Sequence, residues 1–212
     1  LLLIFSSVHN ISLEKLKFYK IININIFGIN MVNNQIIKNN IKNLNLDNIF
    51  LIDEHEIRKV IDTNSLIEKY EIFKNYPSTL NIKILKTEFL ARINIDGKIF
   101  LVGSNGKLIK DNLDNKSLPF IFGKASINEF LNFKKILDQS KFSYDEIENF
   151  FFFPSKRWDL ELKNKTIIKL SRENPKSSLN KAFEFFNDKN FKNIKLIDAR
   201  INNNIIINAP RN

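Results

Sequence analysis

Alternating apolar and polar residues predict the strands of this chain. Isoleucine alternates with asparagine over residues 22–26, and apolar residues alternate with polar ones over residues 80–84. A period of two is typical of strands with one buried face. Before the second of these strands, Pro77 cannot donate to a strand ladder and favours a bend. Residues 70–92 are therefore predicted as strand, tight turn and strand.

Apolar residues at helical spacing predict two helices between these strands. Asn33 and Asn34 are candidate N-caps for a helix that carries isoleucines at positions 36, 37 and 41. Asp53 and Glu56 have the spacing of a capping box, and an apolar stripe at positions 57, 60 and 61 follows them. The order β-α-α-β-β over residues 20–92 predicts a small α+β domain.

The rest of the chain predicts a second, mainly antiparallel β domain with flanking helices. Residues 100–102 and 107–109 flank a Gly-Ser-Asn-Gly turn, which indicates a hairpin. Ser126 and Glu129 form a second capping box, which opens a helix expected over residues 126–139. The other expected elements are a helix at 178–187 and strands at 147–153, 157–162 and 205–207. The predicted fold class is α+β.

Composition excludes several classes of function. The formal net charge is +10, but the lysines and arginines are scattered along the chain. A nucleic-acid-binding protein would gather them into one stripe with interleaved aromatic residues, so we expect no nucleic-acid partner. The 20 phenylalanines and the many lysines, asparagines and isoleucines indicate an AT-rich coding bias. The absence of cysteine excludes disulfides, thiolate metal sites and cysteine nucleophiles.

No group of residues predicts catalysis, a metal or a cofactor. Neither His9 nor His55 has a Cys, His or carboxylate neighbour at zinc spacing, and the chain has no P-loop, dinucleotide fingerprint or nucleophile elbow. Gly103 and Gly106 are better explained by a hairpin turn than by a phosphate-binding loop. Trp158 is expected to pack in the core rather than to stack on a ligand. The protein is not expected to be an enzyme.

The first eight residues, LLLIFSSV, have two interpretations. They could form an ordinary buried strand, or they could be the end of a transmembrane helix or signal anchor. Eight residues are too few to cross a bilayer, which takes about 20 residues in a helix. The chain opens on Leu1 rather than on methionine, which favours the anchor.

Seven fragments, in order along the chain, resemble the FtsQ/DivIB family of bacterial cell division proteins. The turn Tyr-Pro-Ser-Thr-Leu at residues 76–80 is similar to the aromatic-Pro-x-Thr-Leu hairpin of the family's POTRA domain. Later fragments at 118–123, 157–162 and 197–200 are similar to the motifs L-P-x-l-x-G, R-W-D-L-x-L and i-D-l-R. Lys86 and Phe89 replace the glutamate and proline that are usual in the family.

The resemblance implies a domain organisation and a location. Residues 1–19 would be the end of a membrane anchor and a juxtamembrane segment, residues 20–92 a POTRA domain, and residues 93–212 an FtsQ-type β domain. The protein would cross the cell inner membrane once and hold most of its chain in the periplasm. It would be a non-enzymatic divisome scaffold.

The resemblance also implies partner-binding positions. In the family, the last strand of the β domain receives a strand of FtsB, which comes paired with FtsL. The matching positions here are Ile201, Asn203, Ile207 and Asn208. Ile205, in the same apolar run, is expected to take part as well. Positions that match POTRA contacts with other division proteins are Ile72 and Lys74, with Lys86 as the altered one.

Two other functions remain open at this point. A POTRA domain also occurs in modules of outer-membrane assembly or two-partner secretion, which would bring tandem POTRA repeats or a β-barrel. A soluble α+β enzyme would need a catalytic constellation. Partner binding through a strand edge agrees best with the short apolar strand expected near the end of the chain.

Overall fold

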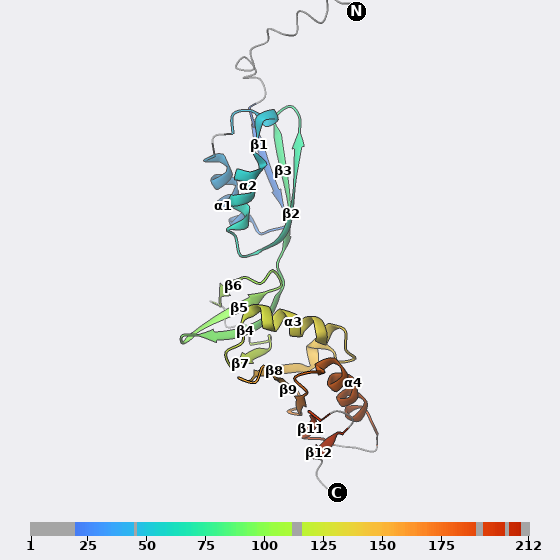
Figure 1. The fold of residues 1–212 in the computed structure, drawn as a ribbon. Helices are drawn as coiled ribbons and strands as arrows, with labels where there is room; N and C mark the ends of the chain where they lie inside the picture. Colours follow the sequence, from blue (N-terminus) through green and yellow to red (C-terminus); the bar gives the residue numbers. More distant parts are fainter. Residues whose placement is uncertain (1–19, 45, 112–115, 190–192, 202–203, 209–212) are drawn as a thin grey trace, which may run out of the picture. The chain divides into compact units, whose positions relative to one another are not determined.

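The computed structural model describes residues 20–44, 46–111, 116–189, 193–201 and 204–208 (Figure 1). The chain divides into two compact units, Leu1–Thr87 and Glu88–Asn212. The expectations for residues 1–19, including the membrane anchor and His9, lie outside the described residues.

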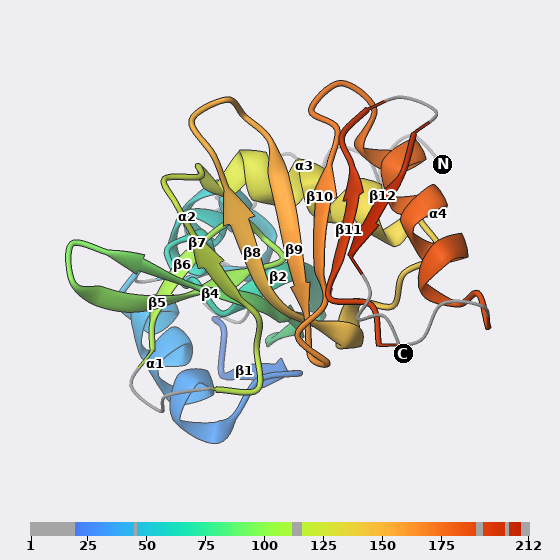
Figure 2. The same ribbon diagram turned by 90° about the horizontal axis from the view of Figure 1, so that it is seen from below.

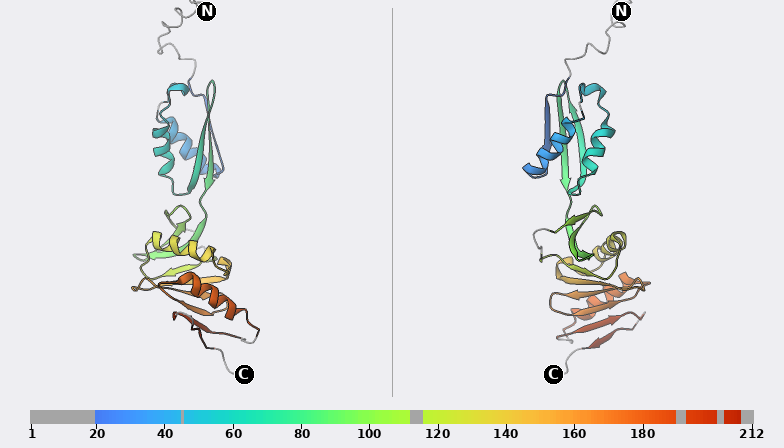
Figure 3. Two further views of the ribbon diagram at one scale, coloured as in Figure 1. Left: turned by 45° about the vertical axis from the view of Figure 1, so that its right-hand side comes forward. Right: turned by 90° about the vertical axis from the view of Figure 1, so that its left-hand side faces the viewer.

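The first unit is a three-stranded sheet with two helices on one of its faces, as Figures 1 and 3 show. The strands lie in the order β1-β3-β2, with β1 parallel and β2 antiparallel to the central β3. Its elements are β1 (Asn23–Phe27), α1 (Met31–Lys42), the 3-10 turn η3 (Ile49–Leu51), α2 (Glu54–Asp62), β2 (Ile67–Asn75) and β3 (Thr79–Lys86). The predicted β-α-α-β-β order is confirmed.

The caps of the first two helices differ in part from the prediction. The N-cap of α1 is Asn30, whose side chain accepts from the Asn33 N–H at 3.0 Å, so Asn33 lies inside the helix. Asp53 caps α2 by accepting from the His55 N–H at 2.8 Å. Glu56 does not reach back to the cap, because it forms an ion pair with Lys59 at 2.8 Å.

The core of the first unit consists of isoleucine and leucine. The alternation in β1 and β3 brings Ile24, Leu80 and Ile82 to the face under the helices, where each is at most 5% exposed. Ile37 and Ile41 of α1 and Ile57 and Ile61 of α2 complete the core cluster from the other side. The period-two and helical patterns of the sequence therefore meet in one apolar layer.

The second unit contains a nine-stranded mixed sheet (Figure 2). The strand order is β12-β11-β10-β9-β8-β7-β4-β5-β6. The strands are β4 (Phe89–Ile95), β5 (Lys98–Gly103), β6 (Leu108–Lys110), β7 (Phe120–Phe122), β8 (Ile147–Phe152), β9 (Trp158–Leu162), β10 (Ile167–Leu170), β11 (Leu196–Ala199) and β12 (Ile206–Asn208). Most pairings are antiparallel, and the β4·β7, β7·β8 and β10·β11 pairings are parallel.

Two helices connect the strands of parallel pairs. α3 (Ile127–Asp138) links β7 to β8, and α4 (Pro175–Phe186) links β10 to β11. Parallel neighbours need such a crossover, because a tight turn cannot join them. Both helices contribute to the core cluster on one face of the sheet, together with Phe150 and Leu160, and Figure 3 shows them on that face. The predicted α+β class, with a mainly antiparallel second domain and flanking helices, is confirmed.

The capping box at α3 is confirmed and is reinforced by a lysine. Ser126 accepts from the Glu129 N–H, and Glu129 accepts from the Ser126 N–H at 2.9 Å. Lys156 forms an ion pair with Glu129 at 2.6 Å. The Lys156 ammonium, followed by the bonds from Ser126, lowers the pKa of Glu129 to about 2. Close to this cap, Trp158 is 7% exposed and stacks on Phe133 at 5.0 Å, which confirms its role in the core.

Several element boundaries differ from the expected ones, most of them by one residue. Residues 89–92, expected at the end of the first domain, form part of β4 and pair with β5 and β7, because Ala91 packs in the second core. Helix α4 begins at Pro175, three residues before the expected start, since proline is favoured in the first helical turn. The last strand covers Ile206–Asn208, one residue later than expected.

Candidate partner-binding edges

The C-terminal end of the large sheet carries a row of charged residues. In register across three strands lie Asp159 of β9, Lys169 of β10 and Asp198 of β11. Asp159 is 3% exposed and Asp198 is 7% exposed, although both are carboxylates. Their neighbours in the chain, Leu160 and Ile197, point to the opposite face and belong to the core. The row therefore lies on the face that α3 and α4 leave uncovered.

Each buried carboxylate is held by an arginine two residues away, just outside the end of the carboxylate's strand. Arg157 donates to both oxygens of Asp159 at 3.0 and 3.1 Å, and the Leu170 N–H donates to Asp159 at 3.2 Å. Arg200 donates to Asp198 through Nε at 2.8 Å and Nη2 at 2.6 Å. Residues two apart in extended backbone share a face, which explains the Arg-x-Asp and Asp-x-Arg spacing at the ends of these strands.

The Arg200 bonds, despite partial burial, lower the pKa of Asp198. Because the folded pKa lies below that of the unfolded chain, this pair stabilises the fold above the ordinary Asp pKa. The contribution is lost as the pH falls through the folded pKa. The end of β11 is therefore electrostatically fixed at neutral pH.

Strand β12 is the outermost strand of the sheet and pairs only with β11 among the described strands. The Lys195 N–H donates to the Asn208 carbonyl at 3.0 Å, so the backbone of Asn208 faces β11. Successive residues of a strand direct their N–H and C=O groups to opposite sides. The N–H and C=O of Ile207 therefore face the open edge, and those of Ile206 face β11.

Most of the residues expected at the C-terminal partner site lie on or next to this edge. Ile205 and Ile207 are half-buried and pack against the core, whereas Ile206 is 57% exposed on the other face. Asn208 is exposed at the end of β12. Ile201 is 57% exposed in the turn after β11. Asn203 lies outside the described residues.

The other expected positions lie on the sheet of the first unit. The Ser78 carbonyl accepts from the Asn23 N–H at 3.3 Å. The backbone groups of even-numbered residues of β3 therefore face β1, and those of odd-numbered residues face β2. The register of β2 then directs the backbone groups of Ile72 and Lys74 to the open side. Lys74 also forms an ion pair with Glu54 of α2 at 3.6 Å. Lys86 is exposed at the end of β3, where it lies opposite Ile67. This is the other end of the β2·β3 ladder from Lys74.

Sequence reasoning missed the charged row, although its signal was present. The Arg157–Asp159 and Asp198–Arg200 pairs could have been recognised as same-face pairs on strands. Lys169 could not, because only the register of β10 with β9 and β11 places it between the two carboxylates. The row ends at Ile206, which lies opposite Asp198 on the edge strand.

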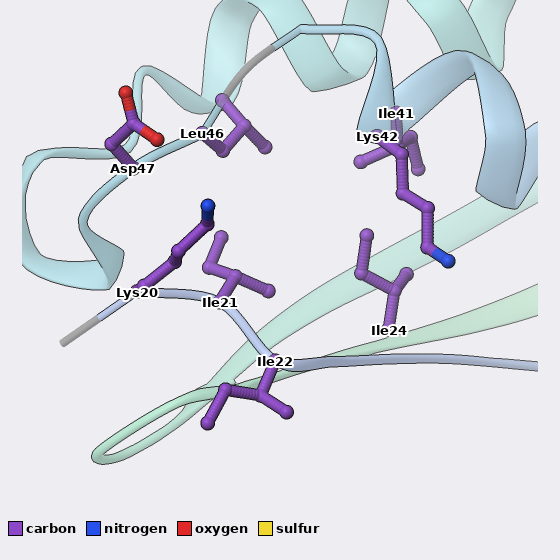
Figure 4. Close-up of a pocket in the computed structure, with 8 residues that line it drawn as sticks. All are labelled: Lys20, Ile21, Ile22, Ile24, Ile41, Lys42, Leu46 and Asp47. Carbon is purple, nitrogen blue, oxygen red and sulfur yellow. The ribbon is translucent and has the colours of Figure 1, made fainter.

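One pocket of the first unit lies beside the start of its sheet. The pocket in Figure 4 has a volume of about 330 Å³ and lies between the start of β1, the end of α1 and the segment before η3. Its lining is mostly aliphatic, with Lys20, Lys42 and Asp47 as its charged residues. Across the described ranges, no cluster of three metal-ligating side chains occurs, and no helix has the length and apolarity to cross a bilayer.

Comparisons with known proteins agree with both units. The family model described as "POTRA domain, FtsQ-type" matches residues 19–86. The model "Cell division protein FtsQ/DivIB, C-terminal" matches residues 91–200, which is about half of the chain.

Similar proteins include bacterial cell division proteins called FtsQ and DivIB. The cell division protein FtsQ of Rickettsia bellii (strain RML369-C) is 26% identical over 198 residues, which cover 85% of this chain and 70% of that protein. The cell division protein DivIB of Staphylococcus aureus (strain NCTC 8325 / PS 47) is 30% identical over 97 residues, covering 46% of this chain and 22% of its own length. A solved structure of the major extracytoplasmic domain of DivIB from Geobacillus stearothermophilus, in its trans isomer, matches with a TM-score of 0.34 and 13% identity. It covers 49% of this chain and 98% of that one.

The two family models match adjoining parts of the chain in the order of the two units. The turn at residues 76–80 and the motifs at 118–123, 157–162 and 197–200 fall inside the matched ranges. This chain belongs to the FtsQ/DivIB family of cell division proteins.

Proposed function

We propose that this cell division protein is a non-enzymatic scaffold that binds FtsB/FtsL-like partners by strand addition to β12. The observation that carries the proposal is the outward N–H and C=O of Ile207 on the last strand of the sheet. An edge strand with unpaired backbone groups is a template for another strand. Membership in a division family favours this function over the outer-membrane assembly or secretion module.

The edge also offers side chains on both faces. The half-buried side chains of Ile205 and Ile207 border the core, so apolar residues of an added strand would extend that core. The opposite face carries the charged row. At the edge of the sheet this row is followed by Ile206 and by the Arg200 side chain, which is 45% exposed. An acidic residue of the partner strand would therefore find a cation within reach, and an apolar one would cover Ile206. The proposed contact positions are Ile201, Asn203, Ile205, Ile207 and Asn208.

We further propose that an N-terminal anchor holds the protein in the inner membrane, with both units in the periplasm. The apolar residues 1–5 of the sequence support this proposal. The scaffold role predicts that the full-length protein recovers FtsB-like and FtsL-like proteins of the same organism from detergent-solubilised membranes. Truncation after Arg200 removes β12 and is expected to abolish this recovery. Unchanged recovery with the truncated protein would contradict partner binding at β12.

The open edge of β2 is a second proposed contact, for another division protein. Ile72 and Lys74 direct backbone groups outward there, with Lys86 at the end of the neighbouring strand. Lys74→Glu is expected to weaken recruitment to the division site, because it reverses the charge near the end of this edge and repels Glu54. Fluorescence microscopy of tagged protein measures recruitment, and Lys98→Glu in the second unit is the matched control. Normal recruitment of Lys74→Glu would exclude this contact.

A further inference from the structure

The sheet of the first unit has a second open edge, at β1. Unlike the β2 edge, it carries no charged residue. β1 pairs only with β3 among the described strands, so its other side is free. Asn23 donates to the Ser78 carbonyl at 3.3 Å and thus faces β3. Alternation then directs the backbone groups of Ile24 and Ile26 to the open side. Proteins usually protect such edges with charged residues or proline, yet β1 (NINIF) contains neither.

A groove lies between this edge and helix α1. It has a volume of about 230 Å³, and its lining includes Ile24, Ile26, Phe27, Met31, Asn34 and Lys38. Phe27 is 55% exposed and Met31 is 79% exposed, so the groove presents apolar surface next to the free backbone groups. Methionine adapts its shape to a bound side chain better than other apolar residues do.

One polar atom in the groove lacks a hydrogen-bond partner. The Asn34 Oδ1 atom is buried and accepts no hydrogen bond from the described residues. A buried acceptor without a donor destabilises the fold, so such atoms are rare in folded proteins. Rotation of the Asn34 side chain toward the groove would let an N–H group of a ligand donate to this atom.

The charge of the groove indicates the chemistry of that ligand. Lys38 lines the groove and has no ion pair with any residue in the described part of the chain, and no carboxylate is among the lining residues. Lys42 follows one helical turn later. A second copy of this chain would bring the same lysines to a twofold β1–β1 pairing, where they would repel each other.

We propose that the β1–α1 groove binds an extended segment of a partner protein that alternates apolar with acidic residues. Its backbone pairs with Ile24 and Ile26, its apolar side chains lie against Phe27 and Met31, and a carboxylate pairs with Lys38. A backbone or side-chain N–H of the segment donates to Asn34 Oδ1. This site is separate from β12 and from β2. A negative result in the test of this site would therefore leave the proposed function unchanged.

The test uses a capped eight-residue peptide of alternating valine and glutamate, and a valine–lysine peptide as its charge-reversed counterpart. Because the chain has no cysteine, Met31→Cys provides a single site for an environment-sensitive fluorophore in the groove. The labelled protein is expected to bind the glutamate peptide and not the lysine peptide. Lys38→Glu is expected to reverse this preference, whereas Lys69→Glu, an exposed change on the opposite edge strand, is expected to preserve it.

Asn34→Leu separates binding from folding. Removing an unsatisfied acceptor is expected to keep or raise the thermal midpoint, while the lost hydrogen bond weakens peptide binding by about tenfold. Equal binding of the two peptides, or unchanged binding after Lys38→Glu and Asn34→Leu, would overturn the proposal. A dimer in sedimentation that Ile26→Pro dissociates would overturn it as well, because a second copy would then be the occupant.

Discussion

Ile207→Pro is expected to abolish binding of the FtsB-like partner while the second unit stays folded. The substitution removes the N–H that faces the open edge and places a proline ring where the added strand would lie. Proline is tolerated on an edge strand when its nitrogen faces outward, so the β11·β12 pairing is retained. Loss of one backbone bond and a steric clash are expected to weaken binding by more than about tenfold.

Ile206→Pro is the matched control, one residue away. Its N–H faces β11, so proline there breaks the sheet's own ladder and is expected to lower the thermal midpoint of the second unit. Pull-down with the partner and thermal unfolding distinguish the two variants. The edge-pairing account fails if Ile207→Pro binds like the wild type, or if the two substitutions exchange their effects.

Gly123→Ala is expected to destabilise the second unit far more than Gly97→Ala. Both glycines have positive φ, +98° and +79°, so alanine is strained at each position. A Cβ at Gly123 would also collide with the Phe152 carbonyl of the neighbouring strand, whereas a Cβ at Gly97 has no atom within 4 Å. The left-handed conformation costs alanine about 1 kcal/mol, and the collision adds roughly 1–3 kcal/mol.

Urea unfolding measures this difference directly. Trp158 is the only tryptophan of the chain and is buried in the second core, so its fluorescence reports this unit. The free energy of unfolding is expected to fall by about 1 kcal/mol for Gly97→Ala and by about 3 kcal/mol for Gly123→Ala. Equal losses would show that the backbone conformation alone requires glycine at position 123.

The sequence predicts elements well where a local pattern decides them. The alternation of β1 and β3 and the Ser126–Glu129 box are local signals, and each corresponds to the observed element. The N-cap of α1 is Asn30 rather than Asn33 or Asn34. Asparagine has the same capping propensity at each of these positions, so the sequence alone does not distinguish them. Pro175 extends α4 by a turn that helical periodicity alone does not reveal.

The order of the large sheet depends on contacts that no local pattern encodes. β7 has only the residues Phe-Ile-Phe and no alternation of apolar with polar residues, yet it joins β4 to β8. The same reason explains the charged row, since Asp159 and Asp198 are separated by 39 positions and meet Lys169 only through strand register. The short apolar run and the family resemblance together predict the open edge at β12, and the resemblance predicts the one at β2. The β1–α1 groove follows from the structure alone.

Amide hydrogen exchange, resolved by residue, tests the account of β12 most directly. In the isolated protein, the Ile206 amide is bonded to β11 and is expected to exchange slowly, while the Ile207 amide faces the open edge and exchanges fast. Addition of an FtsB-like partner is expected to slow the Ile207 amide by at least about tenfold and to leave Ile206 nearly unchanged. An Ile207 amide that still exchanges fast in the saturated complex would contradict strand addition at this edge.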